Sequence, residues 1–147
     1  MNELYDLIKR SEGCHERMPD GRLKAYKCPA GVWTIGWGST GTGVTEGTIW
    51  TQQQADERMA QEADQCIKEA LLLSPILKDK PYKLAAIADF IYNLGASNYS
   101  KSTLRKCVNN QDWVGAMSEL RKWVNGGGKK LPGLVKRRDA EVELMRR

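Results

Sequence analysis

The sequence predicts an α+β fold with a small lobe and a larger helical lobe. Three features support this prediction: a helical pattern opens the chain, a strand-and-turn stretch rich in glycine and aromatic residues follows, and helical patterns fill most of the remainder. At 147 residues we expect one folding unit that buries roughly two-thirds of its unfolded surface. We assign the small lobe to about residues 1–50, a connecting helix to 51–73 and the helical lobe to 74–147.

The first predicted helix ends at a glutamate. Leu4, Leu7 and Ile8 share one helical face, and Gly13 is a favourable helix terminator because glycine adopts the left-handed conformation. Glu12 would then lie at the negative end of the helix dipole, where partial burial also raises the pKa of a carboxyl. Such a carboxyl can serve as a general acid. The alternative is a solvated glutamate without a catalytic role.

Two turn signals organise the stretch after Glu12. The segment 18–22 contains Pro-Asp-Gly, and Pro29–Gly31 separates the strand-like Tyr26 from the strand-like run Val32–Ile35. We therefore expect a small antiparallel sheet directly after the first helix. Such a sheet can hold Cys28 and Thr34 across a cleft from Glu12.

The connecting helix has a clear beginning and end. Thr51–Gln54 has the pattern of a capping box, and Trp50 before it can act as a hydrophobic staple. Ser74-Pro75 ends the helical pattern. Between these limits the apolar positions recur at helical spacing, namely Ala55, Met59, Ala63, Cys66, Ala70 and Leu73.

Helices also account for most of the remaining chain. Pro81 opens a largely apolar helix that Gly95 closes, and we expect this helix at the centre of the second lobe. Shorter helices begin near Ser102 and Asp112. The glycine run 126–128 separates the second of these from a final basic helix.

Charge is distributed unevenly along the chain. Residues 1–73 carry a net charge of −3 and residues 74–147 a net charge of +8, which gives the overall +5. A basic helical lobe can bind nucleic acid or anionic cell-wall and envelope polymers, or can simply be a solvated face. Because no helix interleaves a basic cluster with aromatic residues, we expect no nucleic-acid partner.

The spacing of the cysteines bears on metal binding, and the first residues of the chain bear on where in the cell the protein is located. Four cysteines are widely spaced without a Cys-x-x-Cys pair, which argues against zinc and favours free thiols in a reducing cytosol: Cys14, Cys28, Cys66 and Cys107. No apolar stretch approaches the ~20 residues that span a bilayer. Since Met1-Asn2-Glu3 is not a secretion signal, we expect synthesis and retention in the cytoplasm without membrane insertion.

The segment from Glu12 to Gly38 resembles the catalytic signature of phage-type lysozymes, the endolysins of glycoside hydrolase family 24. That signature runs Glu-Gly, then Leu-x-Ala-Tyr-x-Asp, then Gly-x-x-Thr-Ile-Gly-x-Gly. The chain matches it with Glu12-Gly13, Leu23–Cys28 and Gly31–Gly38. It departs from the pattern at Cys28, where the family usually has aspartate, and at Ser39, where histidine usually follows.

Further blocks resemble the same family in the same order. They are Tyr92–Gly95, Ser102–Leu104, Ala116 followed by Trp123, Gly127–Leu134 and Arg137–Glu141. Together these blocks cover nearly the whole chain. The resemblance implies a lysozyme-like fold and cleavage, with inversion, of the β-1,4 bond between N-acetylmuramic acid and N-acetylglucosamine in peptidoglycan. It implies no metal or organic cofactor, and we expect a monomer that reaches the wall after a separate protein permeabilises the membrane.

The resemblance also implies roles for individual residues. Glu12 corresponds to the general acid, Thr34 to the threonine that positions the attacking water, and Cys28 to the aspartate that acts as base or electrostatic partner. Substrate contacts are expected at four further positions, Thr40, Tyr92, Asn93 and Ser102. Equally, Tyr92 can belong to the core and Asn93 can cap a helix.

Cys28 leaves several readings open. A thiol titrates near ~8.5, against ~3.9 for aspartate, so a thiolate base requires a lowered pKa, which Lys24 and Lys27 could provide. Cys28 could instead be a small buried hydrophobic residue. Asp20 could supply the missing carboxylate, although Pro-Asp-Gly is better explained as a turn tip. Without that carboxylate a lytic transglycosylase is an alternative, and an inactive wall-binding module is the non-enzymatic one.

Overall fold

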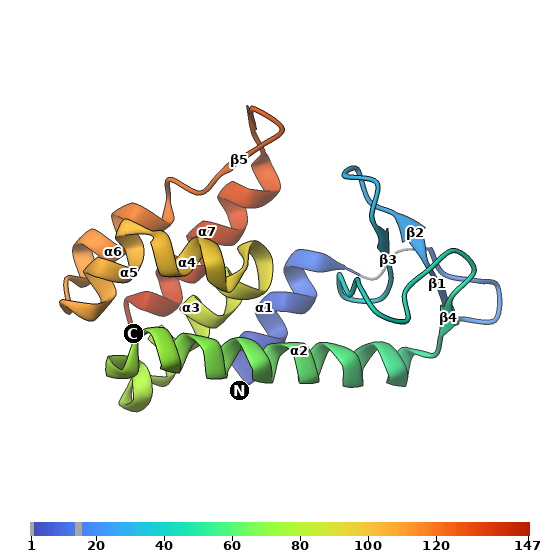
Figure 1. The fold of residues 1–147 in the computed structure, drawn as a ribbon, viewed down its shortest axis with the longest axis horizontal. Helices are drawn as coiled ribbons and strands as arrows, with labels where there is room; N and C mark the ends of the chain where they lie inside the picture. Colours follow the sequence, from blue (N-terminus) through green and yellow to red (C-terminus); the bar gives the residue numbers. More distant parts are fainter. Residues whose placement is uncertain (1, 14–15) are drawn as a thin grey trace. The chain divides into compact units, whose positions relative to one another are not determined.

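A computed structural model describes residues 2–13 and 16–147, so Cys14 and His15 lie outside the described residues. Contacts divide the chain into two compact units. One unit comprises residues 8–62, and the other comprises residues 2–7 together with 63–147. The division falls inside two helices, α1 (Asn2–Glu12) and the long, continuous α2 (Gln52–Leu73), so each of them belongs partly to both units (Figure 1).

The unit of residues 8–62 contains four strands of two residues each: β1 (Leu23–Lys24), β2 (Tyr26–Lys27), β3 (Trp33–Thr34) and β4 (Ile49–Trp50). β1 pairs with β4 and β2 pairs with β3, both antiparallel. The expected single sheet is therefore two separate pairs. The reason lies at Ala25, between β1 and β2, whose N–H donates to the carbonyl oxygen of Thr48 at 2.9 Å, so the chain changes partners there.

Beneath these strands lies a small apolar core. It consists of five buried residues, Leu23, Ala25, Ile35, Val44 and Ala55, with three half-buried tryptophans packed against them, Trp33, Trp37 and Trp50. Ala55 is the fourth residue of α2, and it shares this core with Trp50, as a hydrophobic staple requires. The core therefore joins the strands to the first turn of α2.

The capping box at the start of α2 is confirmed. The backbone N–H of Gln54 donates to the Thr51 hydroxyl at 3.1 Å, and the N–H of Thr51 donates to Oε1 of Gln54 at 2.8 Å. Both donors would otherwise be unpaired at a helix N-terminus. The two reciprocal bonds explain why α2 begins one residue after Thr51.

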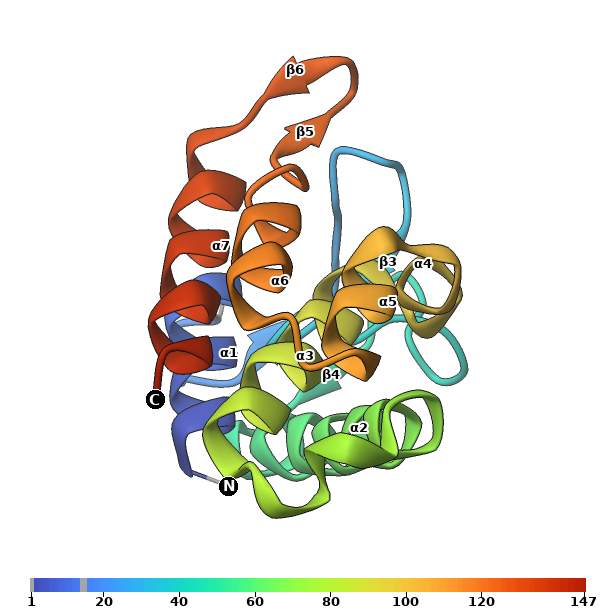
Figure 2. The ribbon, with the colours of Figure 1, turned by 90° about the vertical axis from the view of Figure 1, so that its left-hand side faces the viewer.

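The unit of residues 63–147 is helical. After the second part of α2 it contains η1 (Pro75–Asp79), α3 (Pro81–Leu94), α4 (Ala96–Lys101), α5 (Thr103–Asn109), α6 (Trp113–Leu120), β5 (Asn125–Gly126), β6 (Lys129–Lys130) and α7 (Pro132–Met145). Every residue of α3 from Leu84 to Ile91 is buried, and α3 packs against α7 (Figure 2). The expectation of a buried central helix is confirmed.

The helix limits expected from local signals are also confirmed. The Ser102 hydroxyl accepts from the N–H of Arg105 at 3.0 Å at the start of α5, and Asp112 accepts from the N–H of Gly115 at 3.0 Å at the start of α6. Gly95 ends α3 with φ of 93°. Each of these limits depends on hydrogen bonds or dihedral angles within a few residues, so sequence alone could locate them.

Three short elements were not expected from the sequence: η1, α4 and the β5–β6 hairpin. The glycine run 126–128 does more than separate two helices. Gly127 and Gly128 have φ of 58° and 79°, and they form the turn that pairs Asn125 with Lys130. Within the described residues, no helix is long and apolar enough to cross a bilayer.

Candidate active site

Glu12 is the last residue of α1. The N–H of Gly13 donates to the carbonyl oxygen of Lys9 at 3.2 Å, and Gly13 has φ of 66°. A residue in this left-handed conformation satisfies one of the final carbonyls and ends a helix. The half-buried side chain of Glu12 is thereby placed at the helix C-terminus, as the sequence predicts.

The carboxyl group of Glu12 lies directly against Gly38. A Cβ atom added to Gly38 would lie 2.6 Å from Oε1 of Glu12 and 3.1 Å from its Cδ, and Gly38 has φ of 88°. The backbone conformation favours glycine at this position, and any side chain here would displace the Glu12 carboxyl. The last glycine of the Thr-Ile-Gly-x-Gly motif is what allows the carboxyl to reach the loop after β3.

A polar group that the sequence did not reveal anchors this loop. Trp37 donates from Nε1 to Oδ1 of Asp56 at 2.7 Å, and Gln52 donates to the same oxygen at 3.0 Å. The ammonium of Lys9 lies 3.9 Å from that oxygen and 5.5 Å from the centroid of the Trp37 ring. These contacts hold the loop next to α1 and α2, and no local spacing predicts them, because Trp37 and Asp56 meet only in the folded chain.

Ser39, where the resemblance expects histidine, is fully buried. Its N–H donates to the carbonyl oxygen of Ile35 at 3.0 Å, and its carbonyl accepts from the N–H of Ile35 at 2.9 Å. Its hydroxyl has no hydrogen-bond partner among the residues that the structure describes. Backbone pairing, rather than the side chain, therefore closes the turn that carries Gly38.

Cys28 and Thr34 lie on the same face of the β2–β3 hairpin. Tyr26 is opposite Thr34, and the N–H of Cys28 donates to the carbonyl oxygen of Val32 at 3.0 Å. Since side chains alternate along a strand, residues 26, 28, 32 and 34 share one face. The Thr34 hydroxyl is within hydrogen-bond reach of the Cys28 sulfur, and its single proton is otherwise donated to the carbonyl of Val32 at 3.0 Å.

The pKa of the half-buried Cys28 thiol is lowered. The main cause is the backbone N–H of Val32, followed by that of Ala30, and the Thr34 hydroxyl and the N–H of Gly31 add to the effect. Burial acts in the opposite direction; its effect is smaller than that of Val32 or Ala30 but larger than that of Thr34 or Gly31. N–H groups aimed at a sulfur stabilise its thiolate form.

The expectation that Lys24 and Lys27 lower the pKa of Cys28 is wrong. Neither lysine contributes to the lowered pKa, and the ammonium of Lys27 lies over the Trp33 ring, 5.5 Å from its centroid. Neighbouring residues of a strand point to opposite faces, so Lys27 is directed away from the face that carries Cys28. Proximity in sequence did not become proximity in space.

Asp20 lies at the tip of a turn, as its Pro-Asp-Gly context predicts. The N–H of Gly21 donates to the carbonyl oxygen of Met18 at 2.9 Å. The Asp20 carboxylate accepts from the N–H of Arg22 at 3.0 Å and from its Nε at 2.7 Å, and these bonds lower the pKa of Asp20. The carboxylate is thus committed to its own turn, which weighs against its use as the missing catalytic carboxylate.

The four expected substrate contacts divide between the two units. Thr40, in residues 8–62, is exposed, and its carbonyl oxygen accepts from Nη2 of Arg58 at 3.0 Å. Tyr92 and Asn93 are half-buried near the end of α3, and Oδ1 of Asn93 accepts from Nη2 of Arg138 at 2.8 Å. Ser102 is buried, and its hydroxyl caps α5 while donating to the carbonyl oxygen of Tyr99 at 2.7 Å.

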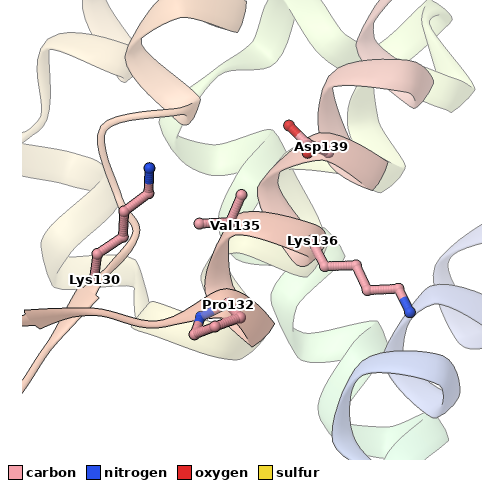
Figure 3. Close-up of a pocket in the computed structure, with 5 residues that line it drawn as sticks. All are labelled: Lys130, Pro132, Val135, Lys136 and Asp139. Carbon is pink, nitrogen blue, oxygen red and sulfur yellow. The ribbon is translucent and has the colours of Figure 1, made fainter.

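A pocket of about 420 Å³ lies beside α7, and none of the four expected substrate contacts lines it. It is lined by Lys130, Pro132, Val135, Lys136 and Asp139. Figure 3 shows that the ammonium groups of Lys130 and Lys136 point in different directions rather than toward one another. Because its cationic groups do not converge, the pocket does not have the arrangement of an anion-binding site.

Comparison with known proteins places these features in a family. The family model described as phage lysozyme matches residues 9–141. The chain belongs to the phage lysozyme family. It is 41% identical over 145 residues to the endolysin of Acyrthosiphon pisum secondary endosymbiont phage 1, covering 94% of this chain and 91% of that protein.

Solved structures agree with this assignment. The endolysin from Escherichia coli O157:H7 phage FAHEc1 superposes with a TM-score of 0.82 and 26% identity, over 99% of this chain and 91% of that one. The active form of the P1 phage endolysin Lyz gives a TM-score of 0.76 and 31% identity, over 99% of this chain and 83% of that one. The lysozyme-like α+β fold is confirmed, and the chain is a lysozyme, a peptidoglycan hydrolase that acts on the bacterial cell wall.

Within the described residues, no group of three or more His, Cys, Asp or Glu side chains could hold a metal ion. The groups near the Cys28 thiol are backbone N–H groups and the Thr34 hydroxyl, and the Glu12 carboxyl lies against Gly38.

Proposed function

We propose that this lysozyme cleaves the β-1,4 bond between N-acetylmuramic acid and N-acetylglucosamine by direct attack of water with inversion. Glu12 is the general acid, Thr34 positions the water, and Cys28 accepts its proton. The observation that carries the proposal is the Cys28 thiol, whose pKa is lowered by backbone N–H groups and which lies beside the Thr34 hydroxyl.

Glu12 would protonate the glycosidic oxygen as the bond breaks. Its carboxyl rests on Gly38, where no side chain competes for the space, and the contact limits the positions that the carboxyl can take. A general acid typically contributes about 10²- to 10⁴-fold to a rate, provided that it is held within reach of the leaving oxygen. The close contact with Gly38 supports Glu12 in this role.

Cys28 would remove the proton of the attacking water. A thiolate stabilised by the N–H groups of Val32 and Ala30 can accept a proton, which a neutral thiol with an ordinary pKa does poorly. The Thr34 hydroxyl can donate its proton to Val32 or to Cys28, and its lone pairs then accept from the water. Oxygen from water adds to the anomeric carbon on the face opposite the leaving group.

The test is product analysis of digested peptidoglycan across a range of pH. Glu12→Gln should lose about 10²- to 10⁴-fold in rate. Cys28→Asp should keep activity, because it restores a base, whereas Cys28→Ser should lose most of it, because a serine hydroxyl is not ionised at neutral pH. Equal activity of wild type and both Cys28 variants would reduce this residue to a spacer.

The same products distinguish a lytic transglycosylase, which the missing carboxylate at Cys28 favours as the second candidate. A transglycosylase needs one acid and no water-activating base, and it releases 1,6-anhydro-muramic ends. The proposed hydrolase releases reducing ends of inverted configuration instead. Anhydro ends from the wild type would overturn the hydrolytic mechanism.

The basic region 74–147 would also attract anionic envelope polymers, and we propose that the protein acts as a monomer without nucleic acid. Its exposed cations include Lys101, Lys106, Lys129, Lys130 and Lys136. We further propose that it stays in the host cytoplasm until a separate protein permeabilises the membrane. Binding to the envelope that does not weaken with added salt would contradict the electrostatic attraction to envelope polymers. Muramidase activity in the medium of cells whose membrane is still intact would contradict retention in the cytoplasm.

A further inference from the structure

The guanidinium of Arg138 is fully buried and surrounded by partners. Its Nε lies 2.8 Å from Oε1 of Glu141, and its Nη2 donates to Oε2 of Glu141 at 3.0 Å. Nη1 donates to the carbonyl oxygen of Trp123 at 3.4 Å, and the Phe90 ring centroid lies 5.3 Å from Cζ. These contacts allow the guanidinium only one orientation.

One donor of this fixed group is directed at Asn93. Nη2 of Arg138 donates to Oδ1 of Asn93 at 2.8 Å. A guanidinium has donors only, so the oxygen of the Asn93 amide must face it and the NH₂ group must point the other way. Arg138 therefore decides which end of the amide faces it, although it lies 45 residues further along the chain.

Glu141 in turn holds Arg138. The two residues are three positions apart on α7, both side chains are fully buried, and the carboxyl group engages the guanidinium through two atoms. The hydrogen bond from Nη2 to Oε2 and the opposite charge hold the guanidinium beside Glu141, whereas Nε and Oε1 lie at ion-pair distance without a hydrogen bond. Asn93 itself is half-buried rather than enclosed.

We propose that Arg138, held by Glu141, is a positioning residue for substrate recognition. It fixes the Asn93 amide so that its NH₂ group donates to an acceptor oxygen of the glycan, the carbonyl of an N-acetyl group. This inference rests on the proposed function and on the substrate contact that the family resemblance implies for Asn93. It deepens that function by naming the group recognised and the residue that sets the recognition.

The experiment compares kcat/KM on N-acetylated glycan strands with kcat/KM on chemically de-N-acetylated strands, which lack the carbonyl. Wild type should prefer the acetylated strands. Asn93→Asp keeps an acceptor for Arg138 but has no donor. Arg138→Lys keeps the charge but loses the planar guanidinium that donates to Asn93, Glu141 and Trp123 at once. Each variant should lose roughly 3- to 10-fold of the preference.

A double substitution shows whether Arg138 acts through Asn93. In an Asn93→Ala background, Arg138→Lys should leave the preference unchanged, because no amide remains to be oriented. A purely structural role would lower kcat/KM on both substrates by the same factor in either background. That result would overturn the proposal.

The matched control is Arg105→Lys. Arg105 is a half-buried arginine of the same unit that donates from Nε to the carbonyl oxygen of Leu73 at 3.0 Å. It should lower Tm without changing the preference for acetylated strands. If Arg138→Lys does not fold, Asn93→Asp decides the matter, and an unchanged preference in that variant overturns the inference. A wild type that cleaves neither substrate would instead refute the proposed function.

Discussion

The two compact units hold their family motifs in different ways. In residues 8–62 the groups around Glu12 and Cys28 are placed by glycine and by backbone N–H groups, as at Gly38 and Val32. In residues 63–147 the Arg-Arg-x-Ala-Glu motif is placed by buried charges that pair with one another. The first arrangement depends on space and the second on ion pairs between buried groups, so substitutions in the two regions should have different effects.

The buried charges should be the more sensitive to loss of a partner. Arg137 donates from Nε and Nη2 to the two oxygens of Asp89 at 2.9 Å and 2.8 Å, and both side chains are buried. Asp89→Asn leaves a buried guanidinium without its counter-charge, which should lower the free energy of unfolding by about 3–5 kcal/mol. Urea unfolding measures this change.

Glu143→Gln is the matched control for that prediction. Glu143 pairs with Arg146 at 2.7 Å, but both side chains are more than half exposed. Exposed pairs contribute only about 0–1 kcal/mol, so this variant should unfold almost as wild type does. Equal destabilisation by the two substitutions would remove the distinction between the buried and the exposed pair.

The glycine-based region should instead lose activity with a smaller loss of stability. Gly38→Ala places a Cβ atom only 2.6 Å from the present position of Oε1 of Glu12, so the carboxyl has to move. Displacing a catalytic group by about 1 Å can cost on the order of 10²-fold in rate. Lysis rates of peptidoglycan suspensions measure the loss.

Gly43→Ala separates the clash from the backbone strain. Gly43 has φ of 83°, close to the 88° of Gly38, but a Cβ atom there would meet nothing within 4 Å. Both variants carry a strain of about 1–3 kcal/mol from the left-handed backbone. Only Gly38→Ala should lose activity; similar rates in the two variants would show that contact with Glu12 is unimportant.

The smallest expected effect is a dependence of stability on pH. Burial and the neighbouring Asp89 raise the pKa of Glu141 well above 4.5, although Arg138 and Arg137 oppose the shift. Because the folded state holds this proton more tightly than the unfolded state, the stabilisation is complete below 4.5 and is lost as pH rises through the folded pKa.

Glu141→Gln carries no such proton, so wild type should lose stability relative to this variant as pH rises above 4.5 and through the raised pKa of Glu141. Urea unfolding at several pH values measures the difference between the two proteins. Parallel stability profiles over that range would show that Glu141 does not titrate there.

Much of the fold could be predicted because its signals are local. The capping box at Thr51, the caps at Ser102 and Asp112, and the glycine that ends α1 are each satisfied within three or four residues. The short elements η1 and α4 lack such a signal and were missed. The β5–β6 hairpin has its glycines, but its strands of two residues carry no alternating pattern.

The site was predicted less completely. The motif located Glu12, Cys28 and Thr34, and the structure brings Glu12 to Gly38 and Cys28 to Thr34. Catalytic and substrate-contact roles remain predictions. The sequence did not reveal the Asp56 anchor of Trp37, nor the backbone origin of the Cys28 pKa shift, because both depend on groups that only folding brings together.

The sequence by itself determined the family, the order of most helices and the identity of the candidate catalytic residues, since these are written in short motifs and local hydrogen bonds. Only the tertiary structure decided why those motifs need their residues. A side chain at Gly38 would displace the Glu12 carboxyl, and Asn93 is oriented by Arg138, 45 residues away. Such contacts form only when distant parts of the chain come together on folding, and the spacing of residues in the sequence does not predict them.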